Sequence, residues 1–393
     1  MRESRIYLTK NTIFVYCKTA SPLYNKRMKI CYLNRSLKSH TGAGRFCLSL
    51  IREAQILDPN LTYTVLTTEP SNHAKERSLI FGNKIKLFAA LGAIRNIIKN
   101  YDVIHALDAW PYGVVAVLAG IGLNKKTIIT AVGSGAVRPL YSWWRKPLMK
   151  WAYKKADSVT AISNHTKKEI LKVIPGLKIE VINHGVDFDK FQQISNNSDK
   201  FRNLQPYILS VGTWKPRKGF EYSIKAFGQI KDKFPNLKYV ILSNAPEEIK
   251  TKDSRIIFIN NLSETELINL YKNAELFILL PQDDGKDIEG FGLVFLEAAA
   301  CGLPVIATKG TSAEDAVRAY DSKNSNASEW NSDGLNRFNG ILVSPKDYKE
   351  AADAILKILS DQNLKKSFAE ESLKFAKEMN WGKVAQAYKK IYD

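Results

Sequence analysis

The stretch from Leu279 to Thr308 constrains the fold more than any other part of this 393-residue chain. An apolar run over 275–280 predicts a buried strand, which ends at Pro281 in an acidic, glycine-containing loop. A helix is predicted from about Leu293 to Ala300, closed by a glycine, and 305–307 predicts the next buried strand. The order of strand, loop, helix and strand is typical of an α/β domain.

Two features of this stretch point to chemistry. Gly290 and Gly292 come just before the helix, where free backbone N–H groups and the positive end of the dipole attract anions. The absent side chains would let a diphosphate approach. Glu289 lies in the loop and Glu297 about one and a half turns into the helix, so both carboxylates can line one cleft. The alternative for either glutamate alone is an ordinary acid at a helix start or on a solvated face.

The full string is similar to EGFGLxxLEAMACGLPVIAT, the outline of the Glu-x7-Glu signature of retaining glycosyltransferases of family four, which have the GT-B fold. The resemblance covers about residues 28–393 and is strongest over 207–308. It implies that Glu289 holds the donor sugar and diphosphate together with the turn after it, formed by Gly290, Phe291, Gly292 and Leu293. It also implies that Glu297 accepts hydrogen bonds from the nucleotide ribose.

Composition limits the class of protein. The length favours two domains, and no apolar run reaches the about 18 residues that span a bilayer. The N-terminus lacks the apolar core of a signal peptide. Four scattered cysteines fit reduced thiols rather than a disulfide or zinc scaffold. We therefore expect a cytoplasmic protein, and peripheral attachment to the inner face of a membrane is a further hypothesis.

The net charge of +19 comes from 58 Lys and Arg against 39 Asp and Glu. Such an excess suits anionic partners, which include phosphorylated substrates, anionic membranes and nucleic acid. Nucleic acid ranks last, because the sequence contains no helix-turn-helix, RNP motif or zinc finger.

Residues 1–27 are expected to form an extension, either a short hairpin or a segment before the first strand of the sheet at Met28–Leu33. After that strand, Gly42, Gly44 and Arg45 precede a helix. A glycine pair there lets phosphate approach, although a tight turn without a ligand is the alternative. The loop resembles the family's GGxGR loop, which faces the donor diphosphate, so Gly42, Gly44 and also Arg45 are candidate donor contacts.

Strand and helix patterns alternate through the rest of the first half, as in a Rossmann-like domain. Val132 stands where many relatives carry a histidine that reaches the transferred sugar. We therefore expect Asp108, His105 or Ser134 to supply this polar contact, or donor recognition to differ. For His105, a packed residue at a strand end is the alternative.

The segment 141–155 contains three tryptophans, five Lys or Arg and no acid. Pro147 suits the first turn of a helix, which leaves two tryptophans in the loop before it. This composition is typical of a patch that binds anionic lipid, with the candidates Trp143, Trp144, Arg145, Lys146 and Lys150. The alternative is that Leu148, Trp151 and Ala152 face the core while the lysines form a solvated face.

We expect a first domain over 28–200, a donor-binding domain over 201–379, and a helix over 380–393 that returns to the first domain. An Asn/Ser-rich insertion is expected over 314–337.

The second domain opens with a strand and a loop that contains Arg217 and Lys218 before a helix. Many relatives have GRxxxxKG there, whose arginine and lysine neutralise the diphosphate. Here Thr213 replaces that arginine, and Arg217 is expected to restore the second cation. The alternative is that Arg217 and Lys218 are ordinary surface charges of a turn.

These expectations amount to the GT-B fold, two Rossmann-like α/β domains facing across a cleft. The resemblance implies transfer of a sugar from a UDP-, GDP- or ADP-sugar to a hydroxyl of a glycan or lipid-linked acceptor, with retention at the anomeric carbon. The pathway would be the synthesis of cell-surface polysaccharide or lipopolysaccharide. Catalysis would depend on Arg217, Lys218 and Glu289, with no cofactor and no metal.

Two alternatives to the transferase stay open. One is a nucleotide-sugar 2-epimerase, which shares this architecture. The other is a non-catalytic protein that binds nucleotide sugars or an anionic polymer, suggested by Val132 and Thr213.

Overall fold

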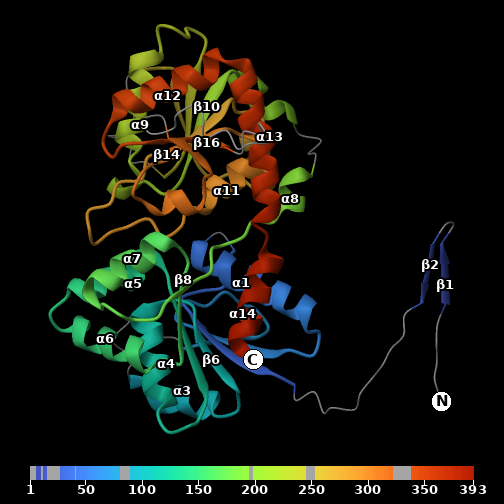
Figure 1. The fold of residues 1–393 in the computed structure, drawn as a ribbon, viewed down its shortest axis with the longest axis vertical. Helices are drawn as coiled ribbons and strands as arrows, with labels where there is room; N and C mark the ends of the chain where they lie inside the picture. Colours follow the sequence, from blue (N-terminus) through green and yellow to red (C-terminus); the bar gives the residue numbers. More distant parts are fainter. Residues whose placement is uncertain are drawn as a thin grey trace.

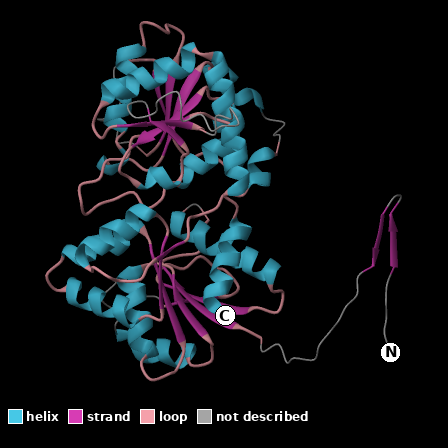
Figure 2. Ribbon diagram, viewed as in Figure 1, coloured by secondary structure: helices cyan, strands magenta, loops and turns pink. Residues whose placement is uncertain are grey.

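The computed structural model describes residues 6–9, 12–15, 27–39, 41–79, 89–193, 198–244, 253–321 and 338–393. Within them, two parallel sheets of seven strands each form two domains, drawn one above the other in Figure 1. Helices cover the faces of both sheets, as Figure 2 shows. The predicted pair of Rossmann-like α/β domains is confirmed.

The sheet of the N-terminal domain has the strand order β5-β4-β3-β6-β7-β8-β9. Its inner strands are buried along nearly their whole length, as expected for parallel strands covered on both faces. The strands are β3 (Lys29–Asn34), β4 (Thr62–Thr67), β5 (Glu76–Ser78), β6 (Val103–Ala106), β7 (Lys126–Ala131), β8 (Ser158–Ala161) and β9 (Glu180–Val181). The helices are α1 (Gly42–Leu57), α3 (Leu91–Ile98), α4 (Val114–Gly120), α5 (Gly133–Val137), α6 (Arg145–Lys155) and α7 (Asn164–Val173), with the short turns η1 (Ala109–Gly113) and η2 (Arg138–Tyr141).

The sheet of the C-terminal domain has the order β12-β11-β10-β13-β14-β16-β15. The strands are β10 (Tyr207–Val211), β11 (Lys238–Leu242), β12 (Ile256–Ile259), β13 (Leu276–Ile278), β14 (Val305–Thr308), β15 (Ala319–Asp321) and β16 (Gly340–Val343). The helices are α9 (Phe220–Ile230), α10 (Glu264–Lys272), α11 (Leu293–Ala300), α12 (Tyr348–Ser360) and α13 (Gln362–Glu378), with α8 (Phe188–Gln192) and η3 (Ser198–Leu204) before the domain and η4 (Pro216–Lys218) and η6 (Ser312–Asp315) in its loops.

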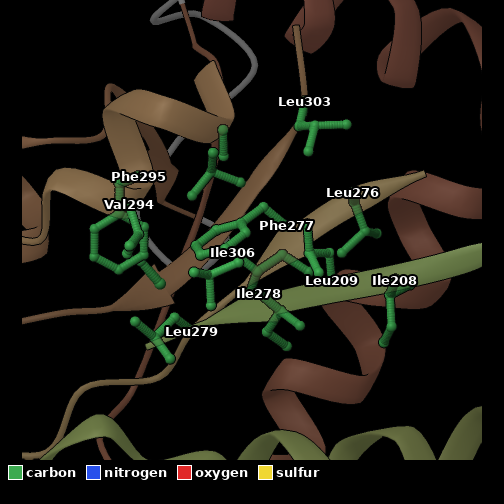
Figure 3. Packing of buried hydrophobic residues seen from close by; sticks show 14 of the residues in the cluster. Ile208, Leu209, Leu276, Phe277, Ile278, Leu279, Val294, Phe295, Leu303 and Ile306 are labelled. Carbon is green, nitrogen blue, oxygen red and sulfur yellow. The ribbon is translucent and has the colours of Figure 1, made fainter. Parts of the chain in front are cut away.

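Strands β13 and β14, on either side of α11, lie in the middle of this second sheet. Phe277 of β13 is fully buried, and its ring meets the ring of Phe295 of α11 edge-on at 5.7 Å (Figure 3). β13 pairs with β10 on one side and with β14 on the other. The helix after the turn is therefore held by the core of its own domain, while its N-terminus is free to face the other domain.

The C-terminal helix α14 (Trp381–Tyr392) packs against α1 of the N-terminal domain, where Figure 1 draws the two side by side. Under this helix, His105 of β6 is fully buried. One ring nitrogen lies 2.9 Å from the Tyr392 hydroxyl and the other lies 2.8 Å from the Thr130 hydroxyl. The Tyr388 hydroxyl lies 3.0 Å from the same Thr130 oxygen. This buried polar network ties α14 to the first sheet.

Two features lie at the margins of the predicted domains. Strands β1 (Ile6–Thr9) and β2 (Thr12–Val15) form an antiparallel pair, which in the described part of the chain pairs with neither sheet. This pair is the hairpin that was one alternative for the N-terminal extension. Most of the insertion predicted over 314–337 lies outside the described residues, and its first part includes β15.

The network under α14 predicts a difference between two substitutions of Tyr388. Tyr388→Ala removes a fully buried ring and should lower the free energy of unfolding by about 3–5 kcal/mol. Tyr388→Phe keeps the ring, loses only the hydroxyl contacts with Thr130 and Thr160, and should cost about 1 kcal/mol. Urea unfolding followed by tryptophan fluorescence would measure both.

Lys390→Ala, an exposed position on the same helix, is the control and should change little. Equal losses for Tyr388→Ala and Lys390→Ala would show that α14 does not depend on this packing.

Candidate functional site

The turn Glu289–Gly292 lies where the two domains meet. A Cβ on Gly133, at the start of α5, would lie 2.7 Å from the Cα of Gly290, so the two backbones are in contact. Gly133 also has a φ of +45°, which favours glycine. The Ser163 hydroxyl donates to the carbonyl oxygen of Gly290 at 2.8 Å. The N-terminal domain therefore holds the backbone of this turn directly.

Glu289 lies in this turn beside two cations. The Lys218 ammonium lies 2.9 Å from its carboxylate, and Nε of Arg217 lies 3.8 Å from the same oxygen. Burial by itself would raise the pKa of Glu289, but the charges of Lys218 and Arg217 outweigh it and lower that pKa below its usual value. Glu289 is thus a buried carboxylate that stays ionised.

The loop that carries the two cations depends on Gly219, which follows η4. Its φ is +66°, and a Cβ there would overlap the carbonyl oxygen of Leu280, two residues after β13. Glycine therefore lets η4 pack close to the strand, and this brings Arg217 and Lys218 to Glu289.

Glu297 forms the second charged contact of the cleft. It pairs with Arg45 of α1 across the domain boundary, and its other oxygen accepts the Tyr271 hydroxyl at 3.0 Å. A pocket of about 200 Å³ lies beside this pair, lined by Ser39, Arg45, Arg52, Lys190, Glu264 and Glu297, among others. Both glutamates of the Glu-x7-Glu spacing therefore face the region between the domains.

The glycines before Arg45 lie on the same first turn of α1. The Thr41 side chain caps this helix and accepts the N–H of Gly44 at 3.0 Å. A Cβ on Gly44 would overlap the carbonyl oxygen of Lys38, whereas Gly42 has open space around it. Gly44 is thus required by the tight loop, and Gly42 leaves room for a ligand.

Of the three residues expected to replace the family histidine, Ser134 contacts the C-terminal domain directly, and the Asp108 carboxylate lies beside Gly135, the next residue. The Ser134 hydroxyl lies 2.5 Å from a carboxylate oxygen of Asp287. Asp108 accepts the N–H of Ala109 at 2.7 Å and caps η1. A sugar contact from His105 is not supported, because its ring is buried under α14 with both nitrogens occupied.

Sequence reasoning missed the acidic loop as a contact between the domains. Asp283 lies 2.5 Å from Nε2 of His165 on α7, and Asp287 lies 3.0 Å from the guanidinium of Arg138. The sequence showed only a cluster of acids at 283–287, with no sign of their partners. We call residues 283–288 the cross-domain loop.

Sequence reasoning also did not single out His184 as a residue of this region. Its ring is buried and lies 4.5 Å from the ring of Phe46, 5.4 Å from Phe291 and 5.5 Å from Trp381, measured between centroids. Burial lowers the pKa of His184 to about 3. This neutral ring packs against α1, the turn at Phe291 and the start of α14 at once.

Residues 141–155 were predicted to form either a lipid-binding patch or a helix with one face in the core, and the structure shows features of both. Trp143 is 88% exposed and Trp144 is 39% exposed, and the Arg145 guanidinium lies over the Trp144 ring at 4.7 Å. The face of α6 that packs into the core consists of Met149, Ala152 and Tyr153. Leu148 and Trp151 are partly buried and pack against the same core, so the prediction that they and Ala152 face the core is confirmed.

Two properties concern the described residues as a whole. None of their helices is long and apolar enough to cross a bilayer. Among the same residues, no three His, Cys, Asp or Glu side chains are grouped so that they could hold a metal ion.

Two family models cover most of the chain. Residues 41–190 match the model described as Glycosyltransferase Family 4, and residues 191–375 match the model described as Glycosyl transferases group 1.

Among relatives, an uncharacterized glycosyltransferase of Methanocaldococcus jannaschii is 25% identical over 85% of this chain and 90% of its own length. A GDP-mannose-dependent α-(1-6)-phosphatidylinositol monomannoside mannosyltransferase of Mycolicibacterium smegmatis is 25% identical over 54% of this chain and 61% of its own. The solved structure of Anabaena HepE in complex with UDP and glucose superimposes with a TM-score of 0.72, at 18% identity, over 93% of this chain and 99% of that one. This similarity in structure shows a shared fold.

The two buried histidines predict how stability depends on pH. Burial lowers the pKa of both His105 and His184 to about 3, against about 6.5 in an unfolded chain. Below pH about 6.5 the unfolded chain binds protons that the folded chain does not. Stability is therefore complete above that pH and falls as the pH is lowered toward 3, by up to about 1.4 kcal/mol per pH unit for each histidine.

His184→Phe should remove the share of one histidine and make this fall less steep. Urea unfolding of both proteins between pH about 4 and 7 would measure the two slopes. Equal slopes would mean that His184 is protonated in the folded chain.

Proposed function

Because the chain belongs to the group 1 glycosyltransferases of family four and has their GT-B fold, we propose that it transfers a sugar from a nucleoside-diphosphate donor to a hydroxyl, with retention at the anomeric carbon. The observation that carries this proposal is the pair of cations at the start of α11. Arg217 and Lys218 meet Glu289 beside a helix N-terminus, which is where a diphosphate would bind best.

The transfer breaks the bond between the anomeric carbon and the diphosphate oxygen, and the bonding electrons leave with the diphosphate. The acceptor hydroxyl oxygen forms the new bond on the same face of the sugar, and its proton passes to the departing diphosphate. No enzymic nucleophile is needed. Arg217, Lys218 and the N–H groups at the start of α11 would stabilise the negative charge that builds on the leaving group. We propose that these cations do so without a metal ion.

The second glutamate would bind the nucleoside. Without a ligand, the Glu297 carboxylate is occupied by Arg45 and Tyr271. Ribose hydroxyls would take over part of this contact and free Arg45 for the diphosphate. For the base, the relative from Mycolicibacterium uses GDP-mannose and HepE binds UDP, so GDP- and UDP-sugars are the first donors to test, followed by ADP-sugars.

A lipid-linked or membrane-surface glycan is the acceptor that we propose. Residues 1–200 contain 31 Lys and Arg against 13 Asp and Glu, whereas residues 201–393 contain 27 against 26. The positive charge is thus concentrated in the half that contains the exposed Trp143 and Trp144. Such a surface suits the anionic inner face of a membrane and the assembly of a cell-surface glycan.

A second candidate is a non-catalytic protein that binds nucleotide sugars. Val132 and Thr213 favour it, because they stand where many relatives carry polar or charged contacts. A binder would retain affinity for the nucleotide but release no product.

Release of nucleoside diphosphate tests the transferase directly. The wild-type chain, screened with UDP-, GDP- and ADP-sugars, should release the diphosphate from one of them. Lys218→Ala should lower kcat about 10²–10³-fold, because it removes a charge that stabilises the leaving group.

Lys215→Ala, an exposed lysine of the same loop, is the matched control and should keep full activity. Nucleotide binding without any release by the wild-type chain would favour the binding protein instead.

The membrane hypothesis predicts lipid binding that depends on the tryptophans. Replacing Trp143 and Trp144 with Ser and Lys146 with Glu should abolish cosedimentation with vesicles rich in phosphatidylglycerol. Replacing the exposed Lys349 and Lys366 of the C-terminal domain with Glu changes charge elsewhere and should leave binding nearly intact. Binding that survives the first set of changes would contradict the hypothesis.

A further inference from the structure

The cross-domain loop is anchored in the N-terminal domain by an apolar side chain. Ile288 is 1% exposed and belongs to the hydrophobic cluster formed by β7, α5 and α6 of that domain. Its N–H donates to the Ser134 hydroxyl at 3.0 Å, and its carbonyl oxygen lies 2.9 Å from the same hydroxyl. A residue of the donor-binding domain thus completes the core of the other domain.

The loop reaches this position in a preformed shape. One carboxylate oxygen of Asp284 accepts the N–H groups of Lys286 at 3.0 Å and of Asp287 at 2.5 Å. Gly285, between them, has a φ of +77°, which a residue with a Cβ rarely adopts. These local contacts fix the backbone on which Asp287 is carried.

Asp287 joins three groups from the two domains. One of its carboxylate oxygens lies 2.5 Å from the Ser134 hydroxyl, 3.0 Å from the Arg138 guanidinium and 3.8 Å from Nε of Arg217. Ser134 and Arg138 come from the N-terminal domain, whereas Arg217 is the cation proposed to bind the diphosphate. Arg217 therefore lies between two carboxylates, those of Asp287 and Glu289.

We propose that Asp287 is a positioning residue for sugar transfer: it fixes Arg217 at the diphosphate only when the N-terminal domain is docked on the cross-domain loop. This inference rests on the proposed function. If the domains separate, Asp287 loses Ser134 and Arg138, and the carboxylate is free to rotate away from Arg217. Docking of the N-terminal domain would therefore also place Arg217, the cation proposed to stabilise the leaving diphosphate.

The same contact explains the place of Ser134. It follows Val132 in the segment where many relatives carry a sugar-binding histidine, yet its hydroxyl is engaged by Asp287 and Ile288. In this chain Ser134 therefore binds the cross-domain loop of the C-terminal domain. The docked loop would also keep water from the anomeric carbon, because Ile288 is buried between the two domains.

Asp287→Asn tests the inference on the full-length chain with the donor found in the screen. It removes the negative charge that faces Arg217 and keeps the size of the side chain. We expect kcat to fall about tenfold or more, the KM for the donor to change less than about threefold, and the share of donor lost to water to rise.

Ser134→Ala should shift the same quantities in the same direction, because it releases Asp287 without touching Arg217. The double variant should lose little more kcat than Asp287→Asn alone, since Ser134 acts on Arg217 through Asp287. Lys286→Gln is the matched control: its side chain is exposed on the same loop, and it should behave as the wild type. Thermal unfolding of each variant checks that it is folded.

Each outcome decides the inference. A wild-type chain that turns over donor while Asp287→Asn matches Lys286→Gln would overturn this inference and leave the proposed function intact. So would a loss of kcat that only follows a lower unfolding temperature, with an unchanged ratio of hydrolysis to transfer. A wild-type chain that releases no nucleoside diphosphate would overturn the proposed function, and this inference with it.

Discussion

The pairing of buried charges across the cleft is the constraint on which the rest of the site depends. A buried carboxylate without a partner is costly, so Glu289 and Glu297 can lie between the domains only because cations reach them. Lys218 reaches Glu289 from within the C-terminal domain, whereas Arg45 reaches Glu297 from the other domain. The ligand-free site is therefore close to neutral. A nucleotide sugar would enter by exchanging these internal partners for its diphosphate and its ribose hydroxyls.

Such pairing requires the two domains to approach closely, and glycines permit this. The contact of Gly133 with Gly290 leaves no room for a side chain on the first of them. Gly219 similarly lets the loop that contains Arg217 and Lys218 pack against Leu280, just after β13. Gly133 thus sets how closely the domains approach, and Gly219 sets how closely the cationic loop approaches Leu280.

The C-terminal helix and the cross-domain loop both extend from the second domain and pack on the first. Helix α14 follows the second domain and packs on the first, where Tyr388 and Tyr392 cover His105. The cross-domain loop leaves the second domain and buries Ile288 in the first. His184 lies near both connections, against Phe291 and Trp381. Movement of one domain would therefore change the packing at Phe291 as well as at the start of α14.

The sequence by itself determined the two α/β domains, the turn before α11, and the grouping of Arg217, Lys218 and Glu289 in one region. The domains and the turn follow from short-range patterns, namely apolar runs and glycines at helix ends. The grouping of Arg217 and Lys218 with Glu289 is what the resemblance to the family implies. Only the tertiary structure decided that His105 is a core residue and that Ser134 binds Asp287, 153 positions away. A single polar residue at a strand end does not indicate which side chains will pack over it. Partners so distant are chosen by how the domains meet, which local patterns do not encode.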